Sequence, residues 1–243
     1  YVCFMPKDLN ALKNGGRIFY FEKNMLKNYK QAKSFFSKHA IEYGIIHCHV
    51  VNRGAPCLFF AKKYGIRERI IHVHSPKYSN GLLKSVVASM TARVCLLLAN
   101  RYIACSEQTG KKVFRDKPFK VINNAIDVSW YLGGNRKTVR SELGIDDTTL
   151  LLGNVGRLAK EKNQSFTIKI FAELKNNPKF ANSKLILIGK GSDYNKISRL
   201  VEKMGLQRDV FFVENADDIA DYYAAMNCFI FPSLYEGLGM ALV

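Results

Sequence analysis

The chain has 243 residues, of which 48% are hydrophobic, and this size and composition predict a globular protein with a packed core. No run of about 18 apolar residues occurs, so the sequence predicts no transmembrane helix. The formal net charge of +17 is unevenly placed: residues 1–140 carry 25 Lys and Arg against 7 Asp and Glu, a net of +18, and residues 141–243 carry 12 against 13, a net of −1.

The basic first part of the chain indicates an anionic partner, such as a membrane surface, a lipid phosphate or a nucleic acid. Ordinary lysine-rich solubility is the alternative, because the lysines are spread along several predicted helices and form no single tract. The charge alone leaves both interpretations open.

The six cysteines lie in apolar segments without a C-x-x-C pair. We interpret them as reduced core residues of a cytosolic protein: Cys3, Cys48, Cys57, Cys95, Cys105 and Cys228. The chain opens with Tyr-Val-Cys-Phe, which is typical of the end of a strand, so a signal peptide is neither visible nor excluded.

Short apolar runs alternate with helical patterns along the whole chain. The expected helices span 23–43, 54–64, 82–99, 107–114, 137–143, 163–176, 194–204 and 218–226. The expected strands between them span 45–51, 69–74, 101–105, 119–122, 150–155, 184–188, 210–213 and 227–231. A further helix is expected to begin after Gly237 and Gly239.

Nearly continuous apolar strands that alternate with helices are typical of parallel sheets covered on both faces. We therefore predict an α/β fold of the doubly wound type. About nine strands would be many for one open twisted sheet, and the charge changes sign near residues 123–142. The sequence thus predicts two Rossmann-like domains, residues 1–127 and residues 128–243.

Ligands of doubly wound sheets bind at the carboxyl ends of the strands. In the second part of the chain, loops 156–163, 189–192 and 232–239 follow predicted strands and would face one crevice. Arg157 and Lys162 flank a predicted helix N-terminus. This arrangement predicts a diphosphate site, because the guanidinium binds bidentately and the ammonium acts as a point charge.

Glu236 stands beside the strand-to-helix turn of loop 232–239. Its carboxylate would accept hydrogen bonds from the hydroxyls of a neutral, polyhydroxylated group. Capping of the following helix is an equally weighted alternative.

In the first part, His47, His49, His72 and His74 occupy two predicted strands and their ends. The i, i+2 spacing places each pair on one side of its strand. We expect no metal there, because no carboxylate or cysteine stands at helical ligand spacing. His74 precedes a loop, where it would orient a sugar hydroxyl or receive a proton, whereas His47 and His72 are expected to be packed strand residues.

The second part carries the motifs Gly156-Arg-Leu with Lys162-Asn163, Ile188-Gly-x-Gly191 and Pro232-Ser-Leu-Tyr-Glu-Gly-Leu-Gly239. The first part carries Ile46-His-x-His49, Ile71-His-Val-His-Ser75, Ala104-Cys-Ser106 and Asn124-Ala-Ile-Asp127. Together these motifs resemble the retaining GT-B glycosyltransferases of family 4, over nearly the whole chain. The resemblance is closest to the branch that acts in bacterial capsule and exopolysaccharide assembly.

The resemblance implies a role for each matching position. The donor diphosphate would be bound by Arg157, Lys162 and the backbone amides of Gly239 and Met240, and the donor sugar by Glu236. The nucleotide would lie against Gly156, Gly189, Gly191, Glu214 and Asn215. On the acceptor side, His74 would lie near the transferred sugar, together with His49 and Ser75.

Two positions depart from the family pattern. Asn227 stands where Asp is usual, and Glu214 stands where the base-binding loop usually has glycine, which weakens the assignment of Glu214 and Asn215. By the same comparison, the family's first strand and glycine-rich loop would precede Tyr1, and a second glutamate and the closing elements would follow Val243. We therefore expect a chain that ends at Val243 to show no transferase turnover and to have a mobile last segment.

The implied activity is transfer of a hexose-type sugar from a nucleoside-diphosphate sugar to a lipid-linked or polysaccharide acceptor, with retention at the anomeric carbon. No metal or other cofactor is expected, and the protein would be cytoplasmic or peripheral at the inner face of the membrane. One alternative is another nucleotide-sugar enzyme, such as an epimerase. A second is a basic nucleic-acid-binding protein, although no recognition-helix motif is present and we expect no nucleic-acid partner.

Overall fold

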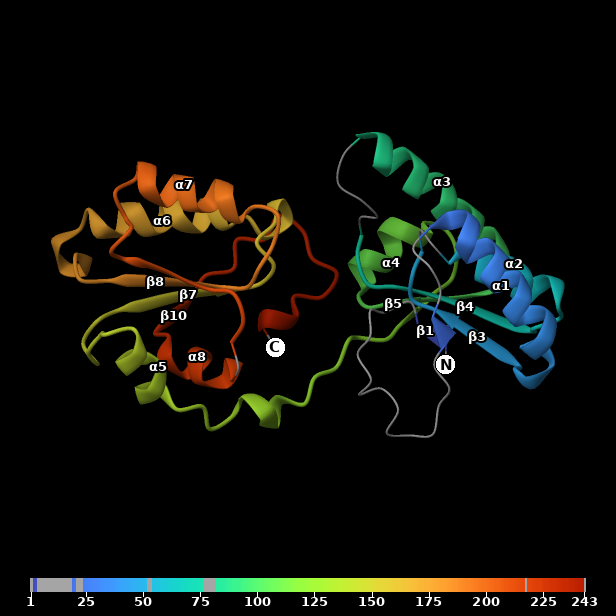
Figure 1. Cartoon of the computed structure of the whole chain (residues 1–243), viewed down its shortest axis with the longest axis horizontal. Coiled ribbons are helices and arrows are strands. Elements are labelled where there is room, and N and C mark those ends of the chain that lie inside the picture. The colour runs from blue at the N-terminus through green and yellow to red at the C-terminus, as the bar shows by residue number, and fades with distance from the viewer. Residues whose placement is uncertain are drawn as a thin grey trace. The chain divides into compact units, whose positions relative to one another are not determined.

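The computed structural model describes residues 2–3, 19–20, 24–51, 54–76, 82–216 and 218–242. The chain divides into two compact units, Tyr1–Asn123 and Asn124–Val243 (Figure 1). The sequence predicts a boundary between residues 127 and 128, and the units meet between Asn123 and Asn124.

The first unit contains a parallel sheet in which the strands follow one another in chain order. The strands are β3 (Ile45–Cys48), β4 (Glu68–Val73), β5 (Arg101–Ala104) and β6 (Lys120–Val121). The helices are α1 (Met25–His39), α2 (Ala55–Lys63), α3 (Leu82–Leu98) and α4 (Glu107–Phe114), and the 3-10 turn η2 (Ala40–Glu42) follows α1. A separate parallel pair joins β1 (Val2–Cys3) to β2 (Phe19–Tyr20).

The described helices of this unit lie on one face of the four-stranded sheet (Figure 1). Strands that advance in one direction through right-handed crossovers place their helices on the same side. The predicted α/β class with Rossmann-like parallel sheets is confirmed, and the described helices of this unit lie on one face of its sheet. Ile45 and His47 of β3 point to the other face and are exposed.

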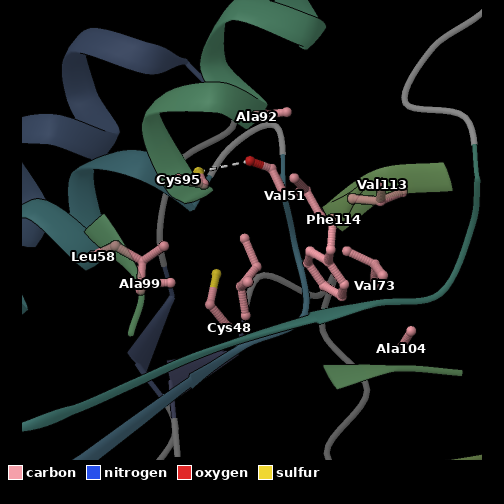
Figure 2. Packing of buried hydrophobic residues seen from close by; sticks show 11 residues of the cluster. Cys48, Val51, Leu58, Val73, Ala92, Cys95, Ala99, Ala104, Val113 and Phe114 are labelled. Carbon is pink, nitrogen blue, oxygen red and sulfur yellow. Dashed lines mark hydrogen bonds between the residues drawn. The ribbon is translucent and has the colours of Figure 1, made fainter. Parts of the chain in front are cut away.

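The core of the first unit forms between the covered face and its helices. Figure 2 shows side chains from β3, β4 and α4 meeting α2 and α3, among them Cys48, Val73, Phe114, Leu58 and Cys95. The Cys95 thiol donates to the carbonyl oxygen of Val51, and burial raises the pKa of this thiol to about 12. The buried free cysteines are core residues as expected: Cys48, Cys57, Cys95 and Cys105. Cys228 is exposed, so its core assignment is wrong.

The second unit contains a parallel sheet in the order β10-β7-β8-β9. The strands are β7 (Leu151–Val155), β8 (Lys184–Ile188), β9 (Val210–Val213) and β10 (Cys228–Phe229). The helices are α5 (Arg136–Glu142), α6 (Gln164–Lys175), α7 (Tyr194–Lys203) and α8 (Ile219–Ala225). The 3-10 turns are η3 (Val128–Tyr131), η4 (Lys160–Lys162), η5 (Pro178–Phe180) and η6 (Met240–Leu242).

Helices cover both faces of this second sheet, as the sequence predicts. Figure 1 shows α6 and α7 on one face and α5 and α8 on the other. Leu185 and Leu187 of β8 pack with Ile168 of α6, while Ile186 and the neighbouring strand residue Leu151 pack toward the opposite helices. Successive side chains of a strand point to opposite faces of the sheet, so each strand contributes residues to two separate cores.

The last segment differs from its prediction. The helix expected after Gly237 and Gly239 is only the 3-10 turn η6, in which the amides of Met240 and Leu242 donate to Leu238 and Gly239 at 2.8 Å. Among the described residues, no helix is both long and apolar enough to cross a bilayer.

A buried arginine joins the elements that begin the second unit. Arg140 of α5 is 2% exposed and donates to the carbonyl oxygens of Asp146, Thr149 and Ala225. It also donates to the side-chain oxygen of Asn227 at 3.3 Å, and the same oxygen accepts from the amide of Leu151 at 2.9 Å. At position 227, where the family pattern usually has Asp, the acceptor that joins α5, β7 and the start of β10 is therefore the uncharged amide oxygen of Asn227.

We expect Arg140→Met to lower the free energy of unfolding of the second unit by about 3 kcal/mol, because each buried carbonyl left without a donor costs about 1–3 kcal/mol. Urea denaturation followed by circular dichroism measures the change. The control is Lys137→Met, an exposed position on the same helix. Equal stability of the two variants would contradict the anchoring role of Arg140.

Candidate functional site

The residues predicted to bind a donor nucleotide lie at one edge of the second sheet. All four strands run parallel, so the loops after β7, β8, β9 and β10 leave from the same edge. Loop 156–163 follows β7, loop 189–192 follows β8, and loop 232–239 follows β10. The strand order places the β7 loop between the other two. The three loops therefore leave the sheet at one edge, and the crevice that they would face stays a prediction.

Three glycines allow the β7 and β8 loops to pack backbone against backbone. Gly156 and Gly189 adopt positive φ values of 153° and 131°. A Cβ atom on Gly189 would lie 2.4 Å from the carbonyl oxygen of Gly156, and one on Gly191 would lie 2.1 Å from that of Leu158. The Leu158 amide in turn donates to the Lys190 carbonyl at 3.1 Å. These glycines thus have a structural role whether or not a nucleotide contacts them.

Both predicted phosphate-binding cations are paired with carboxylates. Arg157, whose side chain is 68% exposed, forms an ion pair with the buried carboxylate of Glu161. Lys162 donates to Glu236 across 2.7 Å, and its ammonium also lies 5.4 Å from the ring centre of Phe231. The structure therefore brings Lys162 and Glu236 together from the β7 and β10 loops.

Asn163 connects the same two loops at the start of α6. It has a left-handed conformation with φ 57° and ψ 37°, which asparagine tolerates better than most residues. Its side-chain amide donates to the carbonyl of Pro232 at 3.2 Å, so it does not cap its own helix. The amide of Leu234 donates to the carbonyl of Glu161 at 2.8 Å, which adds a second link. These bonds hold Glu236 near the N-terminus of α6.

Not every predicted donor residue joins this cluster. Glu214 and Asn215 follow β9 and are exposed, and β7 and β8 separate their strand from β10. The amide of Met240 already donates a hydrogen bond to the carbonyl of Leu238. This bond would have to break before the amide could bind a phosphate. Gly239 packs beside Phe231.

The site also includes residues that the sequence did not single out. Glu161 holds Arg157, and Gln164 donates from its buried amide to the Arg157 carbonyl at 3.1 Å. Tyr235 lies beside these charges: burial raises its pKa, the Glu161 and Glu236 carboxylates raise it further, and Arg157 opposes them. In the sequence, the four-residue spacing of Arg157 and Glu161 could have indicated that these two residues form an ion pair.

In the first unit, four histidines cluster at the ends of β3 and β4. The ring centres of His47 and His49 are 4.2 Å apart, as are those of His72 and His74, and the two pairs stack across the strands. His49 Nδ1 lies 2.8 Å from His74 Nε2, which is a hydrogen bond. The structure thus brings the predicted acceptor-side residues His49 and His74 together. Ser75 follows His74 and is half-buried.

The histidines differ from one another in burial. His72 is buried as predicted, but His47 is exposed, so the prediction of a packed His47 is wrong. Its side chain points to the face of the sheet that the described helices leave uncovered. Burial, followed by the neighbouring imidazoles, lowers the pKa of His49 and of His72 to about 4. At neutral pH both rings are therefore uncharged, and each has one nitrogen with a lone pair.

Comparison with known proteins relates the chain to glycosyltransferases. Residues 135–243 match the family model for glycosyl transferases group 1. EpsF of Bacillus subtilis (strain 168), which is named as a glycosyltransferase, is 25% identical over 97% of this chain. The UDP-Gal:alpha-D-GlcNAc-diphosphoundecaprenol alpha-1,3-galactosyltransferase of Escherichia coli is 24% identical over 88% of the chain.

Solved glycosyltransferase structures have a fold similar to that of this chain. The crystal structure of Anabaena HepE in complex with UDP and glucose has a TM-score of 0.72, with 21% identity over 93% of this chain. The chain spans 64% of the length of EpsF, 59% of the Escherichia coli enzyme and 63% of HepE.

The family match covers the described cluster of Arg157, Lys162 and Glu236, and the structural similarity covers both units. Residues 135–243 are therefore similar to the glycosyl transferases group 1 family, and the chain has the α/β architecture of the GT-B glycosyltransferases.

Proposed function

We propose that the protein transfers a sugar from a nucleoside-diphosphate sugar to an acceptor hydroxyl, with retention at the anomeric carbon. The observation that carries this proposal is the meeting of Lys162 and Glu236 beside Arg157 at the start of α6. Two cations and a helix N-terminus suit a diphosphate, and a carboxylate beside them suits the hydroxyls of the attached sugar. The solved HepE complexes with UDP and UDP-glucose support a donor of this class.

In this proposal, the bond from the anomeric carbon to the diphosphate oxygen breaks, and a bond to the acceptor oxygen forms on the same face of the sugar. Negative charge develops on the leaving diphosphate, where Arg157 and Lys162 stabilise it electrostatically. These cations supply charge compensation from the protein itself, so we propose no metal at the diphosphate.

The ion pair between Lys162 and Glu236 implies an exchange of partners when the donor binds. A phosphate oxygen would take the Lys162 ammonium, and the Glu236 carboxylate would turn to the sugar hydroxyls. The side chains are 21% and 25% exposed, so an incoming donor can reach both groups. The pair keeps each charge compensated until the donor arrives.

We propose a lipid-linked or polysaccharide precursor as the acceptor. The name of the Escherichia coli relative describes a diphosphoundecaprenol-linked acceptor, and another relative is named the capsular polysaccharide biosynthesis glycosyltransferase CapH of Staphylococcus aureus. His74 would then bind the acceptor hydroxyl, with its ring held in place by the hydrogen bond to His49. Cytoplasmic action at the inner face of the membrane stays a prediction.

The first test concerns the diphosphate. We expect Arg157→Ala and Lys162→Ala each to weaken UDP binding by about 1.5–3 kcal/mol, the range for hydrogen bonds to charged groups. Isothermal titration calorimetry on the complete protein measures the affinity. Lys160→Ala is the matched control, because it removes an exposed lysine from the same turn, η4. Unchanged UDP affinity in both test variants would overturn the donor site.

The second test separates sugar contact from phosphate contact. Glu236→Gln should leave UDP affinity within about twofold of the parent, because the amide oxygen can still accept from Lys162. Sugar transfer should fall by about 10²–10³, as when a transition-state contact is removed. A radiolabelled donor with a lipid-linked acceptor measures turnover. Equal loss of UDP binding and of transfer would show that Glu236 only organises the cations.

The basic first unit also supports the proposal of an anionic membrane partner. α3 carries exposed apolar side chains that recur along one side of the helix: Val86, Val87, Met90, Val94 and Leu97. The net charge of +18 in residues 1–140 provides attraction to acidic headgroups, and these side chains provide apolar area to bury.

We expect the protein to sediment with acidic vesicles at low salt and to dissociate as salt rises, because charges more than about 8–10 Å apart are screened at physiological ionic strength. Met90→Asp should weaken sedimentation. Ile41→Asp, which changes a still more exposed apolar residue outside α3, should not. Equal binding to neutral and acidic vesicles would contradict the prediction.

A further inference from the structure

Three histidines of the first unit are arranged as ligands for a metal ion. His47, His49 and His72 each bring a ring nitrogen to within 4.8 Å of the other two. His47 and His72 come from neighbouring parallel strands and stack with their ring centres 5.3 Å apart. The expectation of no metal considered ligand spacing along a helix. Adjacent strands in register bring the rings together without that spacing.

His72 provides an independent indication of a missing ligand. Its side chain is 94% buried, because 6% remains exposed, yet neither Nδ1 nor Nε2 has a hydrogen-bond partner. The backbone of Ile122 lies close enough to this ring to raise its pKa, against the larger lowering by burial. Buried polar atoms are rarely left unsatisfied, because their desolvation is then uncompensated. A bound cation would satisfy one of these nitrogens.

His74 prepares His49 for coordination. The hydrogen bond between His49 Nδ1 and His74 Nε2 occupies one nitrogen of each ring. If His49 donates this bond, its Nε2 presents a lone pair to the other two histidines. Metal-binding histidines commonly use their second nitrogen in this way, which fixes the tautomer and the ring orientation.

We propose that His47, His49 and His72 bind one borderline divalent transition-metal ion, such as Zn²⁺ or Co²⁺, with His74 as the positioning residue of His49. Imidazole nitrogen suits these ions, and three such ligands leave a coordination position for water. Bond lengths of about 2.0–2.1 Å in tetrahedral geometry place ligand nitrogens about 3.3 Å apart, so the ring nitrogens must move closer together. His47 must also rotate out of its stacking with His72, because the lone pair of an imidazole lies in the ring plane. The exposed side chains of His47 and His49 can rotate to do so.

This cation site lies in the first unit, whereas Arg157, Lys162 and Glu236 lie in the second. It is therefore a site additional to the proposed diphosphate site, and it does not depend on metal in the transfer reaction. Equilibrium metal binding tests it without any measurement of sugar transfer, so the two proposals fail separately.

The probes are ZnCl₂ in calorimetry and CoCl₂ in visible absorption spectroscopy, on the complete protein after treatment with a chelator. We expect one ion per chain and the absorption bands of nitrogen-coordinated Co²⁺ in four- or five-fold geometry. His47→Gln removes a ligand and should weaken metal binding at least about tenfold. Loss of a residue that only hydrogen-bonds to a ligand already lowers metal affinity about 10–100-fold. His39→Gln is the control, because His39 lies on α1, outside the histidine cluster, and pairs with Glu42.

A second variant tests the unsatisfied ring. His72→Phe keeps a planar side chain but removes both nitrogens, so the metal-free variant should melt at the parent temperature or above it. Zn²⁺ should raise the melting temperature of the parent and leave that of His72→Phe unchanged. Absence of saturable binding, parent affinity in His47→Gln, or binding lost only in His39→Gln would each overturn the proposal. If His72→Phe does not fold, the comparison of His47→Gln with His39→Gln decides.

Discussion

Parallel strand pairing governs where the chemistry of this chain lies. A parallel strand leaves its sheet at the same edge as its neighbours, so residues that follow separate strands meet without being close in sequence. Loop 156–163 meets loop 232–239 through this pairing, and His49 meets His74 through the pairing of β3 with β4. Both candidate sites depend on this one constraint.

The donor edge achieves its compact form through backbone contacts and compensated charges. Gly189 and Gly191 allow the β8 loop to approach the β7 loop more closely than any side chain would permit. The cations that this packing places at the edge do not stand alone, because Arg157 pairs with Glu161 and Lys162 with Glu236. Charge compensation lets a basic ligand site remain ordered before its anion binds.

The two units differ in how their sheets are covered, and this difference affects their chemistry. The second sheet is enclosed by helices on both faces, and its reactive groups are restricted to loops at the strand ends. The described helices of the first unit cover one face, so that strand side chains such as His47 reach the surface. Imidazoles on adjacent strands can therefore form a cluster within the sheet itself.

The sequence alone determined the α/β class and the position of nearly every strand and helix, because apolar periodicity is a local property. β8 (Lys184–Ile188), β9 (Val210–Val213) and α4 (Glu107–Phe114) match their predicted ranges. Local patterns were less informative where glycine and proline compete with helix or strand, as in the segments that became η6 and the short β10.

Composition and motifs also indicated which residue types belong to a diphosphate site, but only the tertiary structure decided which of them meet. Lys162 and Glu236 are separated by 74 residues, and nothing in their local sequence specifies that they form a pair. The orphaned nitrogens of His72 and the exposure of His47 likewise depend on which face of the sheet is covered. Pairing and burial are properties of the folded chain, because they arise from strand register and from packing between distant segments.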